Sequence, residues 1–249
     1  MGYLNAENIT RSFDGVKIIE NVSIRLDEGE IVSLLGVSGG GKTTLFNILS
    51  GLDKPEGDGK VILNGKDITG KPGEISYMLQ KDLLQPHYTV LDNVALPLIV
   101  RNGMKKKEAR EKAAGYFSAF GLEGTQKKYP HQLSGGMKQR AALLRTYLAS
   151  EGVALLDEPF SALDTITKSA IHKWYLDIMR EIKLSTLFVT HDIEEAILLS
   201  DRIYILSGKP GQISDEIIID LPKDRTNDIT MTEDFLRYKR MIVEKIGQV

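Results

Sequence analysis

Apolar and polar residues alternate with two different periods along this chain, and the two periods separate strands from helices. In residues 22–26, apolar side chains alternate with polar ones, which is the pattern of a half-buried strand. Residues 31–35 form a dense apolar run that ends at Gly36, as a central strand covered on both faces would. Residues 43–52 then show helical spacing. The start of the chain therefore predicts β structure that leads through a buried strand into a helix.

The same two patterns continue to alternate further along the chain. Short apolar runs predict strands at 60–64, 153–156, 186–190 and 203–206, and helical spacing predicts helices at 166–182 and 193–199. The segment 89–147 is helical in character, and 105–120 is rich in Lys, Glu and Ala. Strands that alternate with helices predict an α/β layered core, so the helical block between Gln80 and Val153 is expected to be an inserted subdomain.

The last part of the chain is predicted to be a polar linker followed by a helix. Thr230 and Glu233 have the spacing of a capping box at a helix start. One helical stripe can hold the apolar residues Phe235, Tyr238, Ile242 and Ile246. We expect this stripe to pack on the protein's own core, and a dimer or regulatory contact is the alternative.

Composition narrows the class of protein. The chain has 249 residues, of which 32 are basic and 34 acidic, so its formal net charge is −2. A protein that binds nucleic acid usually has an excess of basic residues, and this chain has none. There is no cysteine, so disulfides, thiolate metal sites and thiol nucleophiles are excluded. No segment approaches the ~20 apolar residues that span a bilayer. If the protein serves a membrane, we expect it to do so from outside the lipid.

A glycine-rich loop follows the predicted buried strand. Residues 36–43 match G-x-x-x-x-G-K-[ST] between a strand and a helix, which is the context that this nucleotide-binding motif requires. Its glycines let backbone N–H groups surround an anion, and the helix start adds partial positive charge. A plain glycine-rich turn is the alternative, and the flanking elements argue against it. The predicted nucleotide-binding residues here are Gly36, Ser38, Gly39, Gly40, Gly41, Lys42, Thr43 and Thr44.

Two acidic residues end the predicted strand at 153–156. Open α/β sheets bind their ligands at the carboxyl ends of the strands, and Asp157 and Glu158 stand at such an end. Asp157 is the natural holder of Mg²⁺, together with the Thr43 hydroxyl, and Lys42 reaches the β and γ phosphates. Glu158 is the candidate that polarises the attacking water. A solvated strand end is the alternative, and the apolar run before these acids argues against it.

Residues 133–140 decide the class of phosphate-loop protein. They read L-S-G-G-M-K-Q-R and resemble the signature motif of ABC ATPases, L-S-G-G-x-x-Q-R, at every fixed position. Physically, Ser134, Gly135 and Gly136 form a second anion cradle at a helix start. A second cradle in one chain makes sense if it faces a partner's nucleotide. A common Ser-Gly-Gly loop is the alternative, and the complete motif argues against it.

The other ABC motifs follow in the expected order. Phe13 resembles the aromatic residue that stacks on adenine, and Gln80, after an apolar strand, resembles the glutamine that binds Mg²⁺ and the attacking water. Residues 161–164 resemble the D-loop and supply Asp164, and His191 resembles the switch histidine that contacts the γ-phosphate. No pair among the four histidines has zinc spacing. We therefore expect the other three to be plain surface residues: His87, His131 and His172.

The resemblance covers about residues 3–211 and implies the fold of an ABC nucleotide-binding domain. That fold is α/β, with a RecA-like P-loop core, an antiparallel β subdomain and an inserted α-helical subdomain. It places the ATPase domain at 1–220, the helical subdomain within it at about 83–147, and a C-terminal linker and helix at 221–249. Departures from the family pattern are small: Thr43-Thr44 stands where Ser-Thr is commoner, and Gly40 adds a glycine to the loop.

The resemblance also implies an ATPase that uses ATP and Mg²⁺. Phosphoryl transfer needs positioning and charge neutralisation more than covalent help. The implied catalytic residues are Glu158, His191, Gln80 and Lys42, and the implied metal ligands are Thr43, Gln80 and Asp157. Because a complete site also needs the signature residues of a second chain, a homodimer with two sites is implied.

Among ABC families, the chain is most similar to the ATPases of importers for nitrate, sulfonates and taurine. The residues that carry this likeness are 80–86, 90–95 and 208–213. It implies transmembrane permease partners, an extracellular solute-binding protein and a peripheral location on the cytoplasmic face of the membrane, with a small oxyanion or heterocycle as cargo. A soluble ABC ATPase acting on DNA or ribosomes is the alternative, but no second cassette, coiled coil or basic arm is visible. A small-molecule phosphotransferase would lack the signature motif.

One segment is a candidate contact for the permease. Leu83, Leu84 and Pro86 follow Gln80 directly in a predicted loop, and apolar residues in a loop suit a partner site. The alternative is that they pack beneath the helical subdomain, as leucine usually would.

Overall fold

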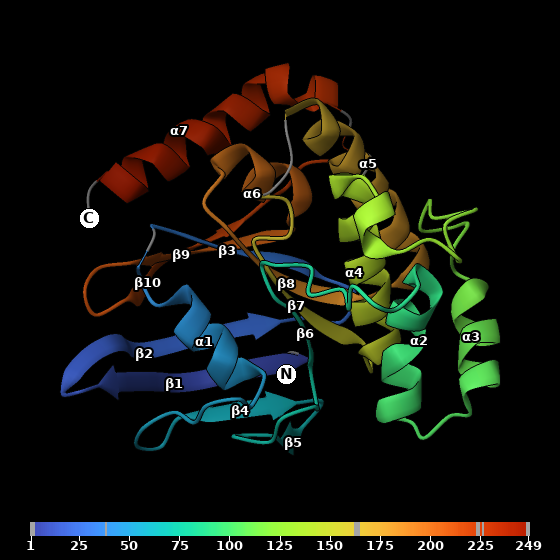
Figure 1. Ribbon diagram of the computed structural model, residues 1–249. Coiled ribbons are helices and arrows are strands. Elements are labelled where there is room, and N and C mark those ends of the chain that lie inside the picture. The colour runs from blue at the N-terminus through green and yellow to red at the C-terminus, as the bar shows by residue number, and fades with distance from the viewer. Residues whose placement is uncertain (1–2, 38, 162–164, 223–224, 226, 248–249) are drawn as a thin grey trace.

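The protein is described by a computed structural model that places residues 3–37, 39–161, 165–222, 225 and 227–247 (Figure 1). Two predicted nucleotide-binding residues, Ser38 and Asp164, lie outside the described residues. Among the described residues, no helix has the length and apolar character needed to cross a membrane.

A six-stranded sheet forms the centre of the molecule. Its order is β10-β9-β3-β8-β7-β6, and every neighbouring pair is parallel except β9 with β10. The strands are β3 (Ile31–Gly36), β6 (Ser76–Met78), β7 (Val153–Asp157), β8 (Ser185–Thr190), β9 (Arg202–Ser207) and β10 (Gln212–Ile218). The strands β3, β7 and β8 are buried along their whole length, which explains why each reads as an apolar run.

A second, antiparallel sheet lies on one side of the first, in the order β2-β1-β4-β5 (Figure 1). Its strands are β1 (Leu4–Phe13), β2 (Val16–Leu26), β4 (Lys60–Leu63) and β5 (Lys66–Asp67). The helix α1 (Lys42–Leu49) lies between the two sheets, and Leu45, Phe46 and Leu49 are fully buried there. This helix starts at Lys42, after the loop that follows β3 at the carboxyl edge of the central sheet.

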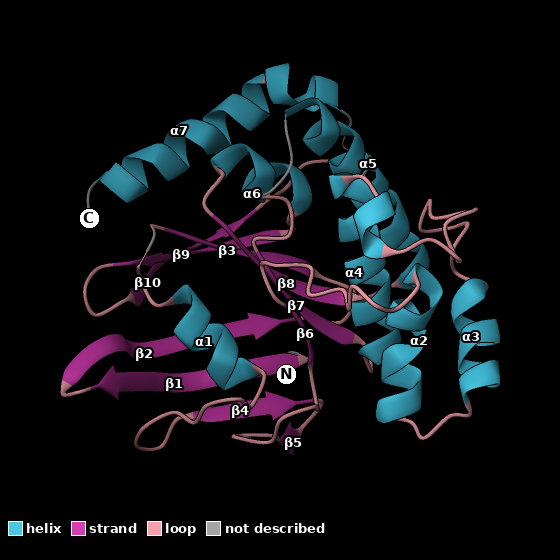
Figure 2. Cartoon of the chain, viewed as in Figure 1, coloured by secondary structure: helices cyan, strands magenta, loops and turns pink. Residues whose placement is uncertain are grey.

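The other helices cover the opposite face and one end of the central sheet (Figure 2). They are α2 (Val90–Val100), α3 (Lys106–Ala114), α4 (Gly135–Ala149), α5 (Thr165–Ile182), α6 (Ile193–Leu199) and α7 (Glu233–Gly247), with short 3₁₀ turns at Pro130–Gln132 and Asn227–Met231. The helices α2 to α4 gather at one side of the molecule in both ribbon views. The α/β fold with an antiparallel β subdomain and an inserted helical subdomain is thus as expected.

Two apolar cores lie on the two faces of the central sheet. Neighbouring residues of one strand point to opposite faces, so Leu34 packs with α1 and the antiparallel sheet, whereas Leu35 packs with the helices. The C-terminal helix α7 packs on the core that contains Leu35 and the other helices, because its residues Phe235, Tyr238 and Ile242 are buried there. The predicted apolar stripe of this helix therefore packs on the protein's own core.

Two local predictions were wrong. The helix α7 begins at Glu233 and the Thr232 hydroxyl caps it by accepting from Phe235 N, so Thr230 is not its cap. Among the histidines, His87 and His131 are exposed, but His172 is buried beside Glu195 and the ring of Phe160.

Candidate nucleotide-binding site

Three strands of the central sheet end at one cavity of about 600 Å³. The loop after β3 supplies the phosphate loop, the end of β7 supplies two acids, and the end of β8 supplies a histidine. Because the strands are parallel and adjacent, segments more than a hundred residues apart in the chain meet at one edge. The cavity is lined by Ile18, Gly39, Gly41, Lys42, Thr43, Thr44, Gln80, Asp157, Glu158 and His191.

Glycines in the phosphate loop are required for two different reasons. Gly41, with φ +90°, caps α1 in the left-handed region, and a Cβ there would lie 2.4 Å from Ile19. A Cβ on Gly36 would lie 2.4 Å from the carbonyl oxygen of Leu206 on the neighbouring strand. Gly39 also has a positive φ of +79°, but open space surrounds it, so its backbone can approach a phosphate.

Lys42 is the first residue of α1 and is almost fully buried. Its ammonium group donates to two carbonyl oxygens of its own loop, at 2.9 Å to Gly36 and 2.7 Å to Val37. Burial lowers the pKa of Lys42, whereas the negative charges of Glu158 and Asp157 oppose this shift. An ammonium has three donors, so these two bonds leave capacity for a phosphate oxygen.

Asp157 ends β7 and is buried at the floor of the cavity. Its carboxylate accepts a hydrogen bond from the Tyr77 hydroxyl at 3.3 Å. Burial raises the pKa of Asp157 and Glu158 raises it further, while the Tyr77 hydrogen bond and Lys42 lower it. A buried carboxylate with one neutral partner retains lone pairs for a cation.

Glu158 lies between two side chains that come from other strands. One carboxylate oxygen accepts from Gln80 Nε2 at 3.1 Å, and the other lies 3.3 Å from Nδ1 of His191. The backbone of Glu158 has φ +45° and its N–H donates to the Val189 carbonyl at 3.1 Å. A glutamate in the left-handed region is strained, and such strain concentrates at functional sites.

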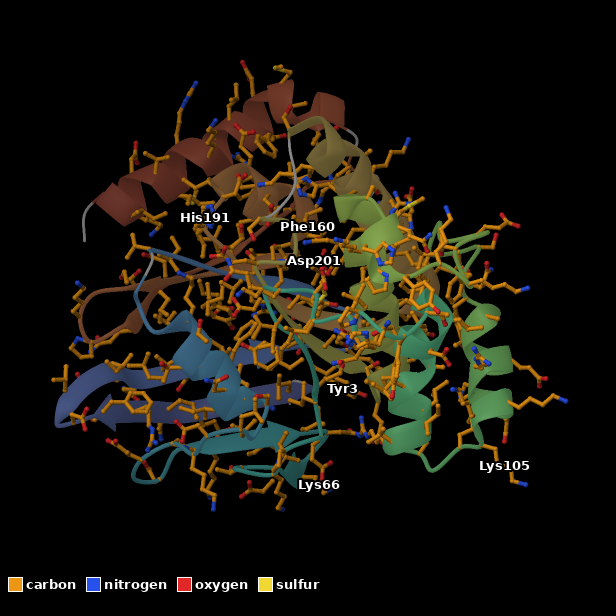
Figure 3. All side chains as sticks on the ribbon, in the orientation of Figure 1. Tyr3, Lys66, Lys105, Phe160, His191 and Asp201 are labelled. Carbon is orange, nitrogen blue, oxygen red and sulfur yellow. The ribbon has the colours of Figure 1, made fainter. Side chains whose placement is uncertain are left out.

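His191 follows β8 and its side chain is 62% exposed, so it can contact a ligand in the cavity. His191 is one of the labelled side chains in Figure 3. The next residue, Asp192, caps α6 by accepting from the backbone N–H groups of Glu194 and Glu195 at 3.0 and 3.2 Å. The start of α6 therefore sets the place of the histidine.

The residues expected to bind Mg²⁺ meet in this cavity and fit that ion. Thr43, Gln80 and Asp157 line the cavity together and offer a hydroxyl, an amide and a carboxylate oxygen. Among the described residues, no group of three or more His, Cys, Asp or Glu side chains could hold a metal by itself. A magnesium ion commonly takes one or two protein ligands and completes its shell with phosphates and water, so the sparse set suits it.

Other predicted site residues lie elsewhere in the chain's own fold. Phe13 is 47% exposed at the tip of the β1–β2 hairpin, with the Arg11 guanidinium 4.9 Å from its ring centre, and it is not among the residues that line the cavity. Ser134 caps α4 by accepting from Met137 N, and Gly135 and Gly136 form the first turn. These three signature residues do not line the cavity either.

Gly135 instead lines a second cleft of about 820 Å³. Gln80, Leu83 and Ser161 line this cleft as well. Leu83 is 50% exposed, whereas Leu84 is 7% exposed and belongs to the helical core. Of the three residues expected to meet the permease, Leu84 thus packs beneath the helical subdomain, while Leu83 and Pro86 are exposed.

Sequence reasoning missed three parts of the site. Tyr77 contacts Asp157 because β6 and β7 are paired, and no motif marks it. Ile18 lines the cavity from the hairpin next to the phosphate loop. Gly211 donates to the Ile18 carbonyl at 2.8 Å, and a Cβ there would lie 2.3 Å from the Gly40 carbonyl. The tight turn before β10 is the signal that could have found this last contact.

Comparison with known proteins identifies the family. The model of a family described as "ABC transporter" matches residues 19–161, which is more than half of the chain. The chain belongs to the ABC transporter family. An ABC ATPase structure similar to this chain is the ATP-binding cassette MJ0796 in a dimeric post-hydrolysis state bound to ADP and Pi. It is 31% identical, covers 88% of this chain and 100% of its own, and superposes with a TM-score of 0.74.

Curated relatives of this ABC ATPase carry names of import systems. The formylaminopyrimidine import protein ThiZ of Halalkalibacterium halodurans is 48% identical over 78% of this chain and 74% of its own length. The nitrate import protein NrtD of Synechocystis is 37% identical over 95% and 92% of the two chains. The aliphatic sulfonates import protein SsuB of Bacillus cereus is 38% identical over 92% and 88%.

Proposed function

We propose that this ABC ATPase is the energising subunit of an importer and that it hydrolyses ATP as a homodimer. The observation that carries the proposal is the separation of two anion cradles in one chain. The phosphate loop lines the 600 Å³ cavity, whereas Gly135 of the signature lines the other cleft. One chain therefore offers two half-sites, and a symmetric pair of chains can close both. A dimeric cassette at 31% identity supports this arrangement.

The residues that line the cavity have different roles in the hydrolysis of ATP. Lys42 and the loop amides bind the β and γ phosphates and neutralise their charge. Glu158 orients the attacking water and accepts its proton, while Gln80 and His191 hold the two carboxylate oxygens of Glu158 in place.

Mg²⁺ completes the site by neutralising phosphate oxygens when it is bound. Thr43, Gln80 and Asp157 would hold it, because all three present oxygens to the same cavity. Phe13 would stack on the adenine if the hairpin tip closes over the nucleotide, and its exposed ring is suited to that contact. Ser38 and Asp164 belong to the proposed nucleotide site on their motif positions alone.

The second copy supplies the other wall of each site. Ser134, Gly135 and Gly136 stand at the start of α4, where the helix dipole and backbone N–H groups favour an anion. We propose that these residues face the γ-phosphate bound by the partner subunit. ATP then holds the two chains together, and hydrolysis releases them.

Transport requires partners that span the membrane, and we propose that the second cleft receives a permease. Leu83 is an exposed apolar residue on the cleft wall beside Gln80, so a movement there reaches the catalytic carboxylate through few bonds. The location that follows is the cytoplasmic face of the membrane, with an extracellular solute-binding protein delivering cargo to the permease.

The cargo that we propose is a small polar solute, either an oxyanion such as nitrate or a sulfonate, or a small heterocycle such as a formylaminopyrimidine. The names of relatives at 37–48% identity support this range. No chemistry of this chain selects among them, because its cavity binds nucleotide and not cargo.

The test is to identify the genes that neighbour this one and to reconstitute the ATPase with the permease and the solute-binding protein that they encode. ATP hydrolysis in lipid nanodiscs should rise when the loaded binding protein is added, and calorimetry of that protein against the solute panel should show the cargo. A complex with the Glu158→Gln variant is the matched control, because it should assemble equally well and its ATP hydrolysis should not rise when the loaded binding protein is added. Tight binding of a sugar, a peptide or a metal would refute the cargo range and leave the ATPase intact.

A soluble ABC ATPase not tied to transport is the second candidate. It predicts full hydrolysis without a permease and no crosslink from the cleft. The chain contains no cysteine, so single cysteines at Leu83 and Pro86 would give unambiguous crosslinks to the permease. A cysteine at the buried Leu84 is the control, and absence of any crosslink at the two exposed positions would favour this candidate.

A further inference from the structure

Arg145 on α4 holds the backbone that follows Gln80. Its Nη1 donates to the Leu83 carbonyl at 2.8 Å, and its Nη2 donates to the Asp82 carbonyl. The same helix begins at the signature residues, ten positions before Arg145, which is about 15 Å along the helix axis. One rigid element therefore carries both the signature cradle and this clamp.

The Arg145 guanidinium, which makes both of these hydrogen bonds, carries a positive charge, and burying a charge costs free energy. Burial lowers the pKa of Arg145, and only the negative charge of Asp82 opposes that shift. A planar guanidinium can donate to two carbonyl oxygens at once, which the single ammonium of a lysine cannot do with the same geometry. The two hydrogen bonds from Arg145 therefore hold the carbonyls of Asp82 and Leu83 in fixed positions relative to α4.

The loop that Arg145 holds is itself strained. Leu83 has φ +45°, a left-handed conformation that a leucine rarely adopts, and its side chain is half exposed. On its two sides, Asp82 accepts from Leu84 N at 2.9 Å and Leu84 is buried in the helical core. The clamp and the buried leucine together maintain a conformation that the local sequence does not favour.

The far end of the loop is fixed to the same subdomain. Asn93 of α2 is fully buried and accepts from Gln85 N at 2.6 Å. Its amide nitrogen donates to the carbonyls of Gln85, Tyr88 and Thr89 at 3.1 to 3.2 Å. The loop from Asp82 onward is thus part of the helical layer at both ends.

Gln80 belongs to the other side of this boundary. Its amide donates to Glu158 at the end of β7 in the central sheet. Only Lys81 then separates a residue held by the catalytic carboxylate from residues held by α4.

We propose that Arg145 is a positioning residue for Gln80. Because Arg145 joins residues 82–83 to α4, the distance from Gln80 to Glu158 depends on where α4 lies. The inference rests on the proposed roles of Gln80 and Glu158.

The test begins with kinetics of three variants of the full chain. Arg145→Met should lower kcat about tenfold and leave the Kd for ATP within about twofold, because it leaves the phosphate loop untouched. Arg145→Lys should fall between Met and wild type. Arg101→Met is the matched control: Arg101 also donates to a backbone carbonyl, that of Ala149, but not to the loop, so kcat should stay within about twofold.

A double-mutant cycle separates positioning from mere destabilisation. In a Gln80→Ala background, Arg145→Met should lower kcat no further, since its effect passes through Gln80. Multiplicative losses, or an unchanged kcat in the single Arg145→Met variant, would overturn the inference. If Arg145→Met does not fold, Arg145→Lys carries the same cycle. A Gln80→Ala variant with wild-type kcat would instead refute the proposed role of Gln80.

Discussion

Replacing Glu158 by glutamine should separate binding of ATP from its hydrolysis. The substitution keeps the shape of the side chain and its place between Gln80 and His191, but it removes the negative charge that would orient and deprotonate water. Loss of a positioned general base costs about 10²–10⁴-fold in kcat, which corresponds to about 3–5 kcal/mol in the activation free energy. The Kd for ATP should stay nearly unchanged.

The cost in stability should be much smaller than the cost in rate. The amide oxygen of a glutamine still accepts from Gln80, and losing the contact with His191 would cost about 1 kcal/mol. The Glu158 side chain is 21% exposed, and removing its charge relieves the repulsion that raises the pKa of Asp157. We expect the Tm to stay within about 3 °C of wild type.

The assay is Mg²⁺-dependent phosphate release together with size-exclusion chromatography in ATP. Glu158→Gln should elute as a dimer with ATP, and its turnover should fall by about 10²–10⁴-fold. Glu158→Asp is the control for position, because it keeps the charge but withdraws the carboxylate by one methylene, and a misplacement of about 1 Å costs about 10²-fold. A Glu158→Gln monomer with wild-type turnover would refute the assignment of the general base.

Three further outcomes follow from the geometry. Gly36→Ala should lower the free energy of unfolding by about 1–3 kcal/mol, because its Cβ would lie 2.4 Å from the Leu206 carbonyl; an unchanged Tm contradicts this. A mixture of Lys42→Ala and Ser134→Arg chains should reach at most one active site per mixed dimer, and two fully active sites would exclude the shared-site arrangement. Burial raises the pKa of Asp157, so in the absence of Mg²⁺ its ionisation should lower the free energy of unfolding as pH rises through that raised pKa, and pH-dependent melting checks this.

Local motifs were predictable because each is one contiguous strand, loop and helix. The phosphate loop needs a strand before it and a helix after it, and both neighbours are visible in the apolar pattern around Lys42. The acids at 157–158 are likewise placed by the strand that precedes them. Edge strands were harder, because β10 is mostly exposed and its apolar alternation is weak.

Burial of individual side chains could not be read from the chain. His172 is a polar residue on a helix, and its burial follows from Phe160 and Glu195, which other segments bring to it. The adjacent residues Leu83 and Leu84 differ in exposure. Leu83 has φ +45° and is half exposed to solvent, whereas Leu84 is buried in the helical core. The exposure of a side chain depends on neighbours that are distant in sequence, so it cannot be predicted from the local pattern of residues.

By itself the sequence determined the family, the α/β fold and the residue types of the site, because glycine, lysine and carboxylate chemistry is written in short contiguous motifs. Only the tertiary structure decided how those motifs meet. Parallel pairing of β6, β7 and β8 brings Gln80 and His191 to the two oxygens of Glu158, across 78 and 33 residues of chain. The same packing turns the signature residues away from the chain's own cavity, because α4 starts at a different cleft. Contacts between distant segments depend on strand order and register, which no single motif encodes.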